Sequence, residues 1–548
     1  MRVAAEYERP VPPLDLPHDD AGVEDVARSG AVRLFVEQAR RVRPDFTLTG
    51  ENTTDVAEIC RRLDGLPLAI ELAAGRIKLL SPHALLTRLD KALDLKASGV
   101  GRPTRQQTLR DTIAWSYDLL TPLQQAVFRR LGVFAGGADL DAIAAVCDDL
   151  LDGDDPLDVV GELVDASLAT VIEEAQEPRI GMLVTVRAYA YDQLQADGEL
   201  AAVQRRHANY FCAVADDMWS LRHGPQQQVA QQRIETELDN LREVLAWALG
   251  SGTGAEPDPE RVALGERLCQ TFAWVWLGGG YFEEARHWLE RCIGLPREAP
   301  DLVHVENLAR LGHIVSIQGD FIRSRELAEA SIDIARGFGD SRELVVGLAV
   351  LAVACWDTGD IEGARRAFEE GHAMVRRVAD RSLTAVLLTD IAYFESEQGN
   401  HDRSQQLIAE VLEICVDIGD TEFATLAELS MITSLFKTGN VAEAHLRSQD
   451  AIDPVLTCRD PFMLIGFARS HADILFETGD LDAAVRLLGS AAVMQERIGI
   501  KDPPAAEAQV QGLLLRCQVA MAAVDFQRAY QAGQAIMVED LLVEMKDH

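Results

Sequence analysis

The stretch Thr358-Gly-Asp-Ile-Glu-Gly-Ala364 recurs at a fixed interval through the second half of the chain, and this repetition decides the fold. Its glycine has a counterpart every 40 residues, and a sixth copy around Gly280 lies one residue out of phase. An aspartate also stands 21 residues after each of the first four glycines in register. The five glycines are Gly319, Gly359, Gly399, Gly439 and Gly479, and the aspartates are Asp340, Asp380, Asp420 and Asp460.

Each unit is expected to form two antiparallel helices that meet at this glycine. Glycine tolerates the left-handed conformation that ends a helix, and the Asp or Asn that follows can cap the next one. A small residue five positions further on lets two helices approach closely; these residues are Ser324, Ala364, Ser404, Ala444 and Ala484. Eight positions before the glycine, the buried face is marked by Leu311, Leu351, Ile391, Met431 and His471. Since one hairpin cannot bury both its faces, we predict a stacked solenoid similar to tetratricopeptide (TPR) repeats.

The composition excludes several classes of protein. The 548 residues carry a formal net charge of −36, so the chain as a whole repels phosphate backbones. Its nine cysteines contain no Cys-x-x-Cys pair, which indicates reduced thiols and neither disulfides nor a zinc site. The sequence shows no leader pattern and no apolar run long enough to span a membrane. We therefore expect a cytoplasmic protein that does not bind membranes.

A motif in the first hundred residues points to a known family. Gly65 ends one predicted helix, and Pro67 suits the first turn of the next. The surrounding stretch Cys60–Arg76 and the later stretch Arg105–Leu120 resemble bacterial STAND regulators, the NB-ARC-like signal-transduction ATPases. The resemblance is to the actinobacterial branch of predicted ATPases associated with LuxR- and SARP-type regulators. It assigns residues 1–107 to a helical remnant of the ATPase module.

In that family the Gly-Leu-Pro-Leu junction packs its proline against the adenine of ADP or ATP. The resemblance therefore implies a vestigial adenine contact at Gly65, Leu66, Pro67 and Leu68. A P-loop needs a lysine directly after a glycine, and none of the six lysines here has one. We expect no ATP hydrolysis, no metal site and no cofactor, with ADP or ATP bound only if a nucleotide core is supplied. A truncated or split reading frame is the expected cause.

Residues 108–200 are expected to form a small winged-helix domain. The predicted helices are Thr108–Leu120, Pro122–Leu131, Leu140–Leu150 and Pro156–Ala169, and the predicted wing strands are Ala169–Glu173 and Arg179–Val186. The run Ile143–Asp149 imitates a Walker B strand, but without a P-loop it is expected to be the acidic end of a helix. In STAND proteins this domain carries a Met-His-Asp switch; here Leu183 and Val184 replace the His and Asp. Nucleotide sensing is therefore not expected.

The charge of this domain argues against direct DNA binding. Its candidate recognition helix, Leu157–Leu168, has no Arg or Lys. Thr121–Leu200 contains 16 acidic residues against 4 arginines. Since affinity for DNA depends on neutralising phosphates, we expect no direct nucleic-acid binding.

The remaining segments are expected to be helical. Residues 201–260 are predicted to be linker helices that open the superhelix, with His207 at the surface or at a helix cap and a loop over Gly250–Pro259. TPR-like repeats fill residues 261–500. A degenerate helical pair, Ala505–Val524 and Phe526–Met545, occupies residues 501–548.

The sequence thus predicts an all-α-dominated protein, with a helical arm and a small winged helix before a TPR-like solenoid. We find no nucleophile elbow and no metal-spaced His or Cys cluster, so we expect no enzyme activity. The expected function is a non-catalytic signalling scaffold of a STAND-type transcriptional regulator. Its partner would be a protein, peptide or small inducer in the solenoid groove, and self-association is left open. The alternatives are direct DNA contact through the winged helix and an ATP-dependent switch whose nucleotide core is encoded upstream or in trans.

Overall fold

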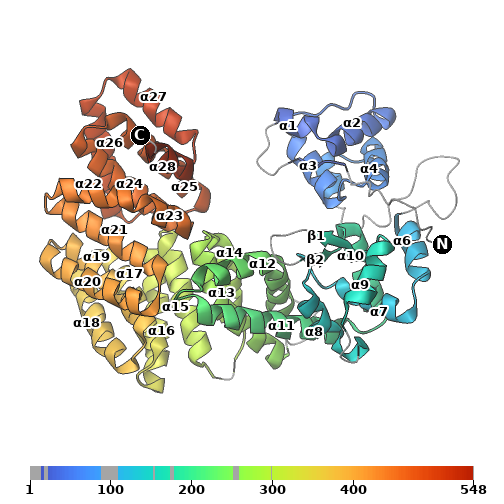
Figure 1. Cartoon of the computed structure of the whole chain (residues 1–548), viewed down its shortest axis with the longest axis horizontal. Coiled ribbons are helices and arrows are strands. Elements are labelled where there is room, and N and C mark those ends of the chain that lie inside the picture. Colours follow the sequence, from blue (N-terminus) through green and yellow to red (C-terminus); the bar gives the residue numbers. More distant parts are fainter. Residues whose placement is uncertain are drawn as a thin grey trace. The chain divides into compact units, whose positions relative to one another are not determined.

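The computed structural model describes residues 14–17, 23–87, 109–151, 155–172, 178–250, 258–297 and 299–546. Within these ranges helices dominate, and one two-stranded sheet occurs (Figure 1). The chain divides into two compact units. The first extends to Phe211 and includes Asp239–Val244, and the second contains Cys212–Leu238 and the residues from Leu245 onward. The predicted all-α-dominated architecture with a TPR-like solenoid is confirmed.

The solenoid lies in the second unit and consists of paired helices. Each first helix packs on the second helix of its own repeat and on the repeat before it (Figure 1). The pairs are α13 (Pro259–Gly278) with α14 (Phe282–Ile293), α15 (Leu302–Ile317) with α16 (Phe321–Ala335), α17 (Arg342–Asp357) with α18 (Ile361–Val378), α19 (Arg381–Glu397) with α20 (His401–Ile418), α21 (Thr421–Lys437) with α22 (Val441–Asp450) and α23 (Ile452–Cys458), and α24 (Pro461–Thr478) with α25 (Leu481–Ile498).

The repeat glycines have the backbone conformation that their position predicts. At all five, φ lies between 81° and 96°. The five small residues that follow are completely buried, because the two helices of each repeat meet there. The predicted cap is made by aspartate only: Asp320, Asp360 and Asp480 accept a helix N–H. Asn400 and Asn440 make no such bond, and their side-chain amides donate to Glu395 and Glu443.

The aspartates 21 residues after the glycines begin the next first helix in three repeats. Asp380, Asp420 and Asp460 accept N–H groups of α19, α21 and α24. Asp340 instead forms an ion pair of 2.6 Å with Arg377, and Ser341 caps α17. One periodic position thus serves as a helix cap or as an ion-pair partner.

In four repeats the last helix also ends at a residue with positive φ, which the sequence analysis did not predict. This residue is Gly419 or Gly499 in two repeats, but Ala379 (φ 57°) and Arg459 (φ 55°) in two others. A side chain makes this conformation unfavourable by roughly 1–2 kcal/mol. The substituted repeats therefore carry backbone strain at this position.

Two substitutions at this position are expected to have opposite signs. Ala379→Gly should raise the melting temperature, because it relieves the left-handed strain at the end of α18. Gly499→Ala should lower it by the equivalent of roughly 1 kcal/mol, although no atom lies within 4 Å of the added methyl group. Thermal unfolding followed by circular dichroism measures both. Shifts of the same sign in the two variants would contradict this account.

The solenoid turns far enough for distant repeats to meet. The amide of Lys501, which follows α25, donates to the carbonyl oxygen of Ile317 at the end of α15 over 2.9 Å. Gly280, between α13 and α14, lies against Pro461 and Ile498. The first helices of the repeats therefore border a shared interior.

The first unit contains two groups of elements. The first group comprises α1 (Val23–Arg28), α2 (Gly30–Val42), α3 (Thr53–Arg62), α4 (Pro67–Ala74), the 3-10 helix η1 (Gly75–Lys78) and α5 (Pro82–Leu86). The second comprises α6 (Leu109–Asp118), α7 (Pro122–Leu131), α8 (Leu140–Leu151), α9 (Leu157–Asp165), strands β1 (Thr170–Ile172) and β2 (Arg179–Gly181), and α10 (Val184–Ala196). Thr170 pairs with Gly181 in an antiparallel register. The acidic run ending at Asp149 lies in α8, as predicted, and Asp149 forms ion pairs with Arg130 and Arg206.

Three local predictions were wrong. The second strand, predicted to reach Val186, ends at Gly181, because the chain enters α10 at Val184 and buries Tyr189 and Leu194. His207 is buried, since it packs between the rings of Phe134 and Phe211.

The last predicted helix is broken in two. The observed helices are α26 (Pro504–Ala520), α27 (Ala523–Gln534) and α28 (Val538–Lys546). The Ile536 carbonyl in the break accepts a hydrogen bond of 2.7 Å from Ser490, and Leu541 and Leu542 are buried beyond it. Tertiary packing therefore offsets the lost helical hydrogen bonds. The loop over 251–257 and the wing turn over 173–177 lie outside the described residues. None of the described helices combines the length and apolarity needed to cross a bilayer.

Candidate functional site

Two positions of each first helix differ in chemistry from repeat to repeat. They stand nine and six residues before the repeat glycine, and this spacing puts them on one helix face. We call this set the variable row: Arg310 and His313, Val350 and Val353, Asp390 and Tyr393, Ser430 and Thr433, Ser470 and Asp473. A row of equivalent positions with different side chains is what a solenoid uses for recognition.

The variable row is partly shielded from water. Burial and, to a smaller extent, the neighbouring Arg310 lower the pKa of His313 to about 4. Burial also raises the pKa of Asp390 to about 7, and among the described residues Asp390 has no ion-pair partner. Neighbouring repeats are joined along the row, since the Thr433 and Ser470 hydroxyl groups lie 3.3 Å apart. The row therefore offers a neutral imidazole, a carboxyl that keeps its proton near neutral pH, hydroxyl groups and apolar valines.

The charge state of Asp390 can be tested through stability. An aspartate ionises near pH 4 in the unfolded chain, whereas Asp390 keeps its proton to about pH 7 in the folded chain. The folded state binds more protons in between, so this carboxyl lowers the free energy of unfolding as the pH rises from about 4 to about 7. Asp390→Asn should therefore raise the melting temperature at about pH 8, and the gain should vanish toward pH 4.

The matched control is Asp333→Asn, which removes an exposed carboxylate from α16. It should give no gain that grows with pH. Melting curves of the three proteins across this range decide the matter, and a gain for Asp390→Asn that is equal at low and high pH would contradict the buried carboxyl.

A segment expected to be a simple linker lies against the first helices of the repeats. Helices α11 (Leu200–Leu221) and α12 (Gln227–Leu249) are joined by a short turn. In this turn His223 Nδ1 lies 2.8 Å from Asp420 Oδ2, and the Gln227 amide donates to Glu422. Burial and the neighbouring Asp460 and Asp420 carboxylates raise the pKa of Glu422 to about 8. The turn therefore covers part of the surface that the prediction left free for a partner.

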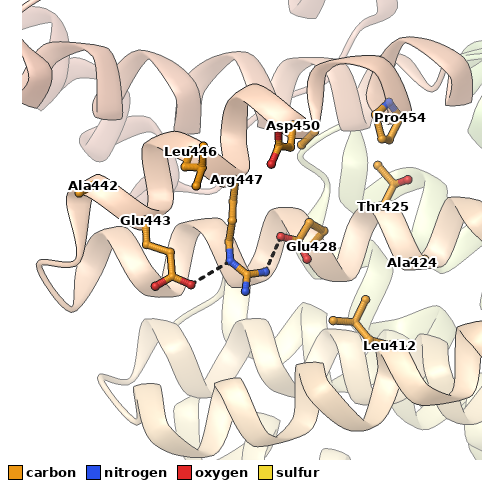
Figure 2. A pocket seen from close by; sticks show the side chains of 11 residues that line it. Leu412, Ala424, Thr425, Glu428, Ala442, Glu443, Leu446, Arg447, Asp450 and Pro454 are labelled. Carbon is orange, nitrogen blue, oxygen red and sulfur yellow. Dashed lines mark hydrogen bonds and ion pairs between the residues drawn. The ribbon is translucent and has the colours of Figure 1, made fainter.

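A separate pocket of about 870 Å³ opens where one repeat is irregular (Figure 2). Its second helix is divided into α22 and α23, and Pro454 in the first turn of α23 has no N–H to continue α22. Arg447 crosses the pocket wall and donates to Glu428 at 2.8 Å and to Glu443 at 3.2 Å (Figure 2). Leu412 and Leu446 supply apolar surface. This pocket contains no member of the variable row.

The Gly-Leu-Pro-Leu junction lies in the first unit. Gly65 has φ 65°, and a Cβ atom there would lie 2.3 Å from the Leu14 carbonyl oxygen. Pro67 is the first residue of α4 and lines a pocket of about 780 Å³ with Leu14. Gly65 and Leu66 do not line this pocket, and the side chain of Leu68 lies outside the described residues. Pro67 thus lines a pocket that a ligand could enter, and the adenine contact stays a prediction.

The stretch that stands in place of the Met-His-Asp motif is hydrogen-bonded to a residue next to the Gly-Leu-Pro-Leu junction. Asp64, also at positive φ, accepts a hydrogen bond from the Thr185 amide in the first turn of α10 over 3.3 Å. The pKa of Asp64 is raised to about 6, because burial raises it by more than the hydrogen bonds from the amides of Val184 and Thr185 lower it. A carboxylate at a helix N-terminus is favourable to the helix dipole. The side chain of Asp64 therefore links the Gly-Leu-Pro-Leu junction to the start of α10, a contact that the sequence analysis did not predict.

No family model matches the chain. A protein of Mycobacterium tuberculosis, provisionally named an HTH-type transcriptional regulator, is 33% identical over 424 residues, which are 76% of this chain and 47% of the relative. An uncharacterized protein of the same species is 41% identical over 211 residues, 38% of this chain and 51% of the relative. The chain thus spans about half the length of the curated relatives it matches.

Two solved structures show a weaker likeness. One is a STAND protein with a tetratricopeptide repeat sensor from Pyrococcus horikoshii, at 13% identity and a TM-score of 0.40, covering 94% of this chain and 74% of that one. The other is a Rap protein in complex with competence and sporulation factor, at 13% identity and a TM-score of 0.37, covering 60% of this chain and 99% of that one.

Proposed function

We propose that the chain is the sensing region of a STAND-type regulator of transcription and is not itself an enzyme. In this proposal the variable row binds a protein, a peptide or a small inducer, and residues 1–200 transmit the bound state. The single observation that carries it is the variable row, in which every repeat presents a different pair of side chains at the same two positions on the solenoid interior. The relative named a transcriptional regulator supports the regulatory context.

The chemistry of the row favours recognition over catalysis. Its imidazole and carboxyl groups, on His313, Asp390 and Asp473, lie on three different repeats, in α15, α19 and α24. Among the described residues no group of His, Cys, Asp and Glu side chains is placed to hold a metal ion. A protonated Asp390 can donate a hydrogen bond to a ligand acceptor at neutral pH, and Tyr393, which is exposed, offers a ring and a hydroxyl. Such a set selects a partner with both polar and apolar groups.

A thermal-shift screen of peptides and small metabolites against the whole chain tests this proposal. A ligand that stabilises the wild-type protein should bind about five- to thirtyfold more weakly to Asp390→Ala or Tyr393→Ala, since a lost ligand hydrogen bond costs about 1–2 kcal/mol. Glu369→Ala, on the exposed side of α18, is the matched control and should bind as the wild type does. Unchanged affinity in both row variants would contradict the proposal; loss in Arg447→Ala alone would move the site to the pocket of Figure 2.

Direct DNA contact through residues 108–200 is a second candidate, because the relative's name refers to a helix–turn–helix protein. The arginines of this segment argue against DNA binding, because each forms an ion pair or a hydrogen bond within the protein. Arg110 pairs with Asp192, Arg129 and Arg130 pair with Glu199, Arg179 donates to backbone carbonyl groups, and Arg187 contacts Glu243. They are therefore not available to neutralise phosphates.

We accordingly expect no shift of labelled duplex DNA by the whole chain in a mobility-shift assay at low salt. Tight binding that weakens steeply with salt would reverse the ranking of these two functions. Micromolar binding of labelled ATP by the chain alone would instead revive the ATP-dependent alternative.

A further inference from the structure

The turn between α11 and α12 places an arginine beside two arginines of the repeats. Arg222 Cζ lies 3.5 Å from the centroid of the Trp219 ring, and Arg342 Cζ, from α17, lies 5.5 Å from the same ring. Both guanidinium groups thus share one indole ring. Arg342 also reaches the Glu306 carboxylate on α15, 3.4 Å away, and Arg310 donates to the same oxygen at 2.7 Å. We call Arg222, Arg310 and Arg342 the arginine cluster.

Arg222 lacks a carboxylate partner. Its Nη1 donates to the Trp219 carbonyl oxygen, and among the described residues no Asp or Glu oxygen lies within ion-pair distance of it. The side chain is half-buried. A buried charge is normally paired, because taking it out of water is costly. The pKa of Arg222 is lowered to about 9: burial is the largest cause, the neighbouring Arg342 and Arg310 also lower it, and the Asp380 and Glu306 carboxylates partly offset the fall.

The local charge does not balance. Glu306 is completely buried and faces Arg310 and Arg342, and Asp380 Oδ2 lies 3.4 Å from Arg342 Nε. Three guanidinium groups thus meet two carboxylates, in a chain whose net charge is −36. The side chains of Arg310 and Arg342 remain 18% and 23% exposed, so a solute can reach them. Arg310 is also the first member of the variable row.

We infer that the arginine cluster is a binding site for an anionic group, a carboxylate or a phosphate, of the effector. The inference rests on the proposed function for the identity of the ligand as an effector, but the anion site itself stands on the cluster. Guanidinium groups bind both oxyanions through paired N–H donors. An anion at Arg222 supplies the missing countercharge, and it bridges the α11–α12 turn to α15 and α17. The site therefore recognises one charged end of a ligand whose other groups contact the variable row.

Inorganic phosphate and succinate serve as probes for the two oxyanions. Calorimetric titration of the whole chain, at constant ionic strength set with chloride, should show saturable binding of at least one of them. Arg222→Gln should weaken that binding at least about tenfold, and Arg222→Lys should weaken it less, because it keeps the charge. Arg323→Gln, an exposed arginine on α16 paired with Glu326, is the matched control and should bind as the wild type does.

The folded state of the variant is checked in the same series. Without added anion, Arg222→Gln should melt at or above the wild-type temperature, because it removes an unpaired charge beside like charges. Phosphate or succinate should then raise the melting temperature of the wild type and of Arg323→Gln, but not that of Arg222→Gln.

Equal binding by all variants, or no saturable binding of either anion by the wild type, overturns the anion site. Neither result changes the outcome of the ligand screen with the Asp390 and Tyr393 variants, so the anion site and the proposed function can be refuted separately. Binding of phosphate alone assigns a phosphate-bearing ligand, and binding of succinate alone assigns a carboxylate.

Discussion

The left-handed glycine between the two helices of each repeat is the constraint on which the solenoid depends. Its positive φ ends the first helix abruptly and sets the second helix antiparallel to it. The buried small residue five positions later then lets the two backbones approach. Because both features recur every 40 residues, each hairpin presents the same apolar face to the next. Stacking follows, since no hairpin can bury that face alone.

Stacking also creates the chemistry of the interior. The amide of Lys501 bonds to Ile317, so repeats far apart in sequence meet and the first helices border a common space. Side chains that would be solvated on an isolated hairpin lose water there. This is why Asp390 keeps its proton to about pH 7 and His313 stays neutral down to about pH 4. The same desolvation leaves Arg222 charged without a partner beside Arg342. Recognition of a ligand can use these unsatisfied groups, because a ligand replaces the water that folding removed.

Periodic information proved more reliable than local pattern. The repeat glycines, small residues and helix pairs were predictable, because the same signal recurs in successive units. The prediction that the second strand continues to Val186 was wrong. The apolar alternation after Gly181 suits a strand, but the chain begins α10 at Val184, where Asp64 accepts a hydrogen bond from the Thr185 amide. The break between α27 and α28 was also missed, because it depends on a hydrogen bond from Ser490 on another helix. For the site, the variable row could be read from the 40-residue register. The arginine cluster could not, because Arg222 and Arg342 are 120 residues apart and meet only across the interior.

The amino-acid sequence alone was enough to predict a helical chain whose second half repeats every 40 residues, and to show that no lysine stands where a P-loop needs it. These properties reside in local preferences and in short motifs, which need no knowledge of distant contacts. The three-dimensional structure was needed to show that the α11–α12 turn covers part of the repeats, that Pro67 lines a pocket, and which ionisable groups are buried. These features depend on which faces of helices distant in sequence pack together, because that packing sets the burial, the ion pairs and the pKa of each side chain.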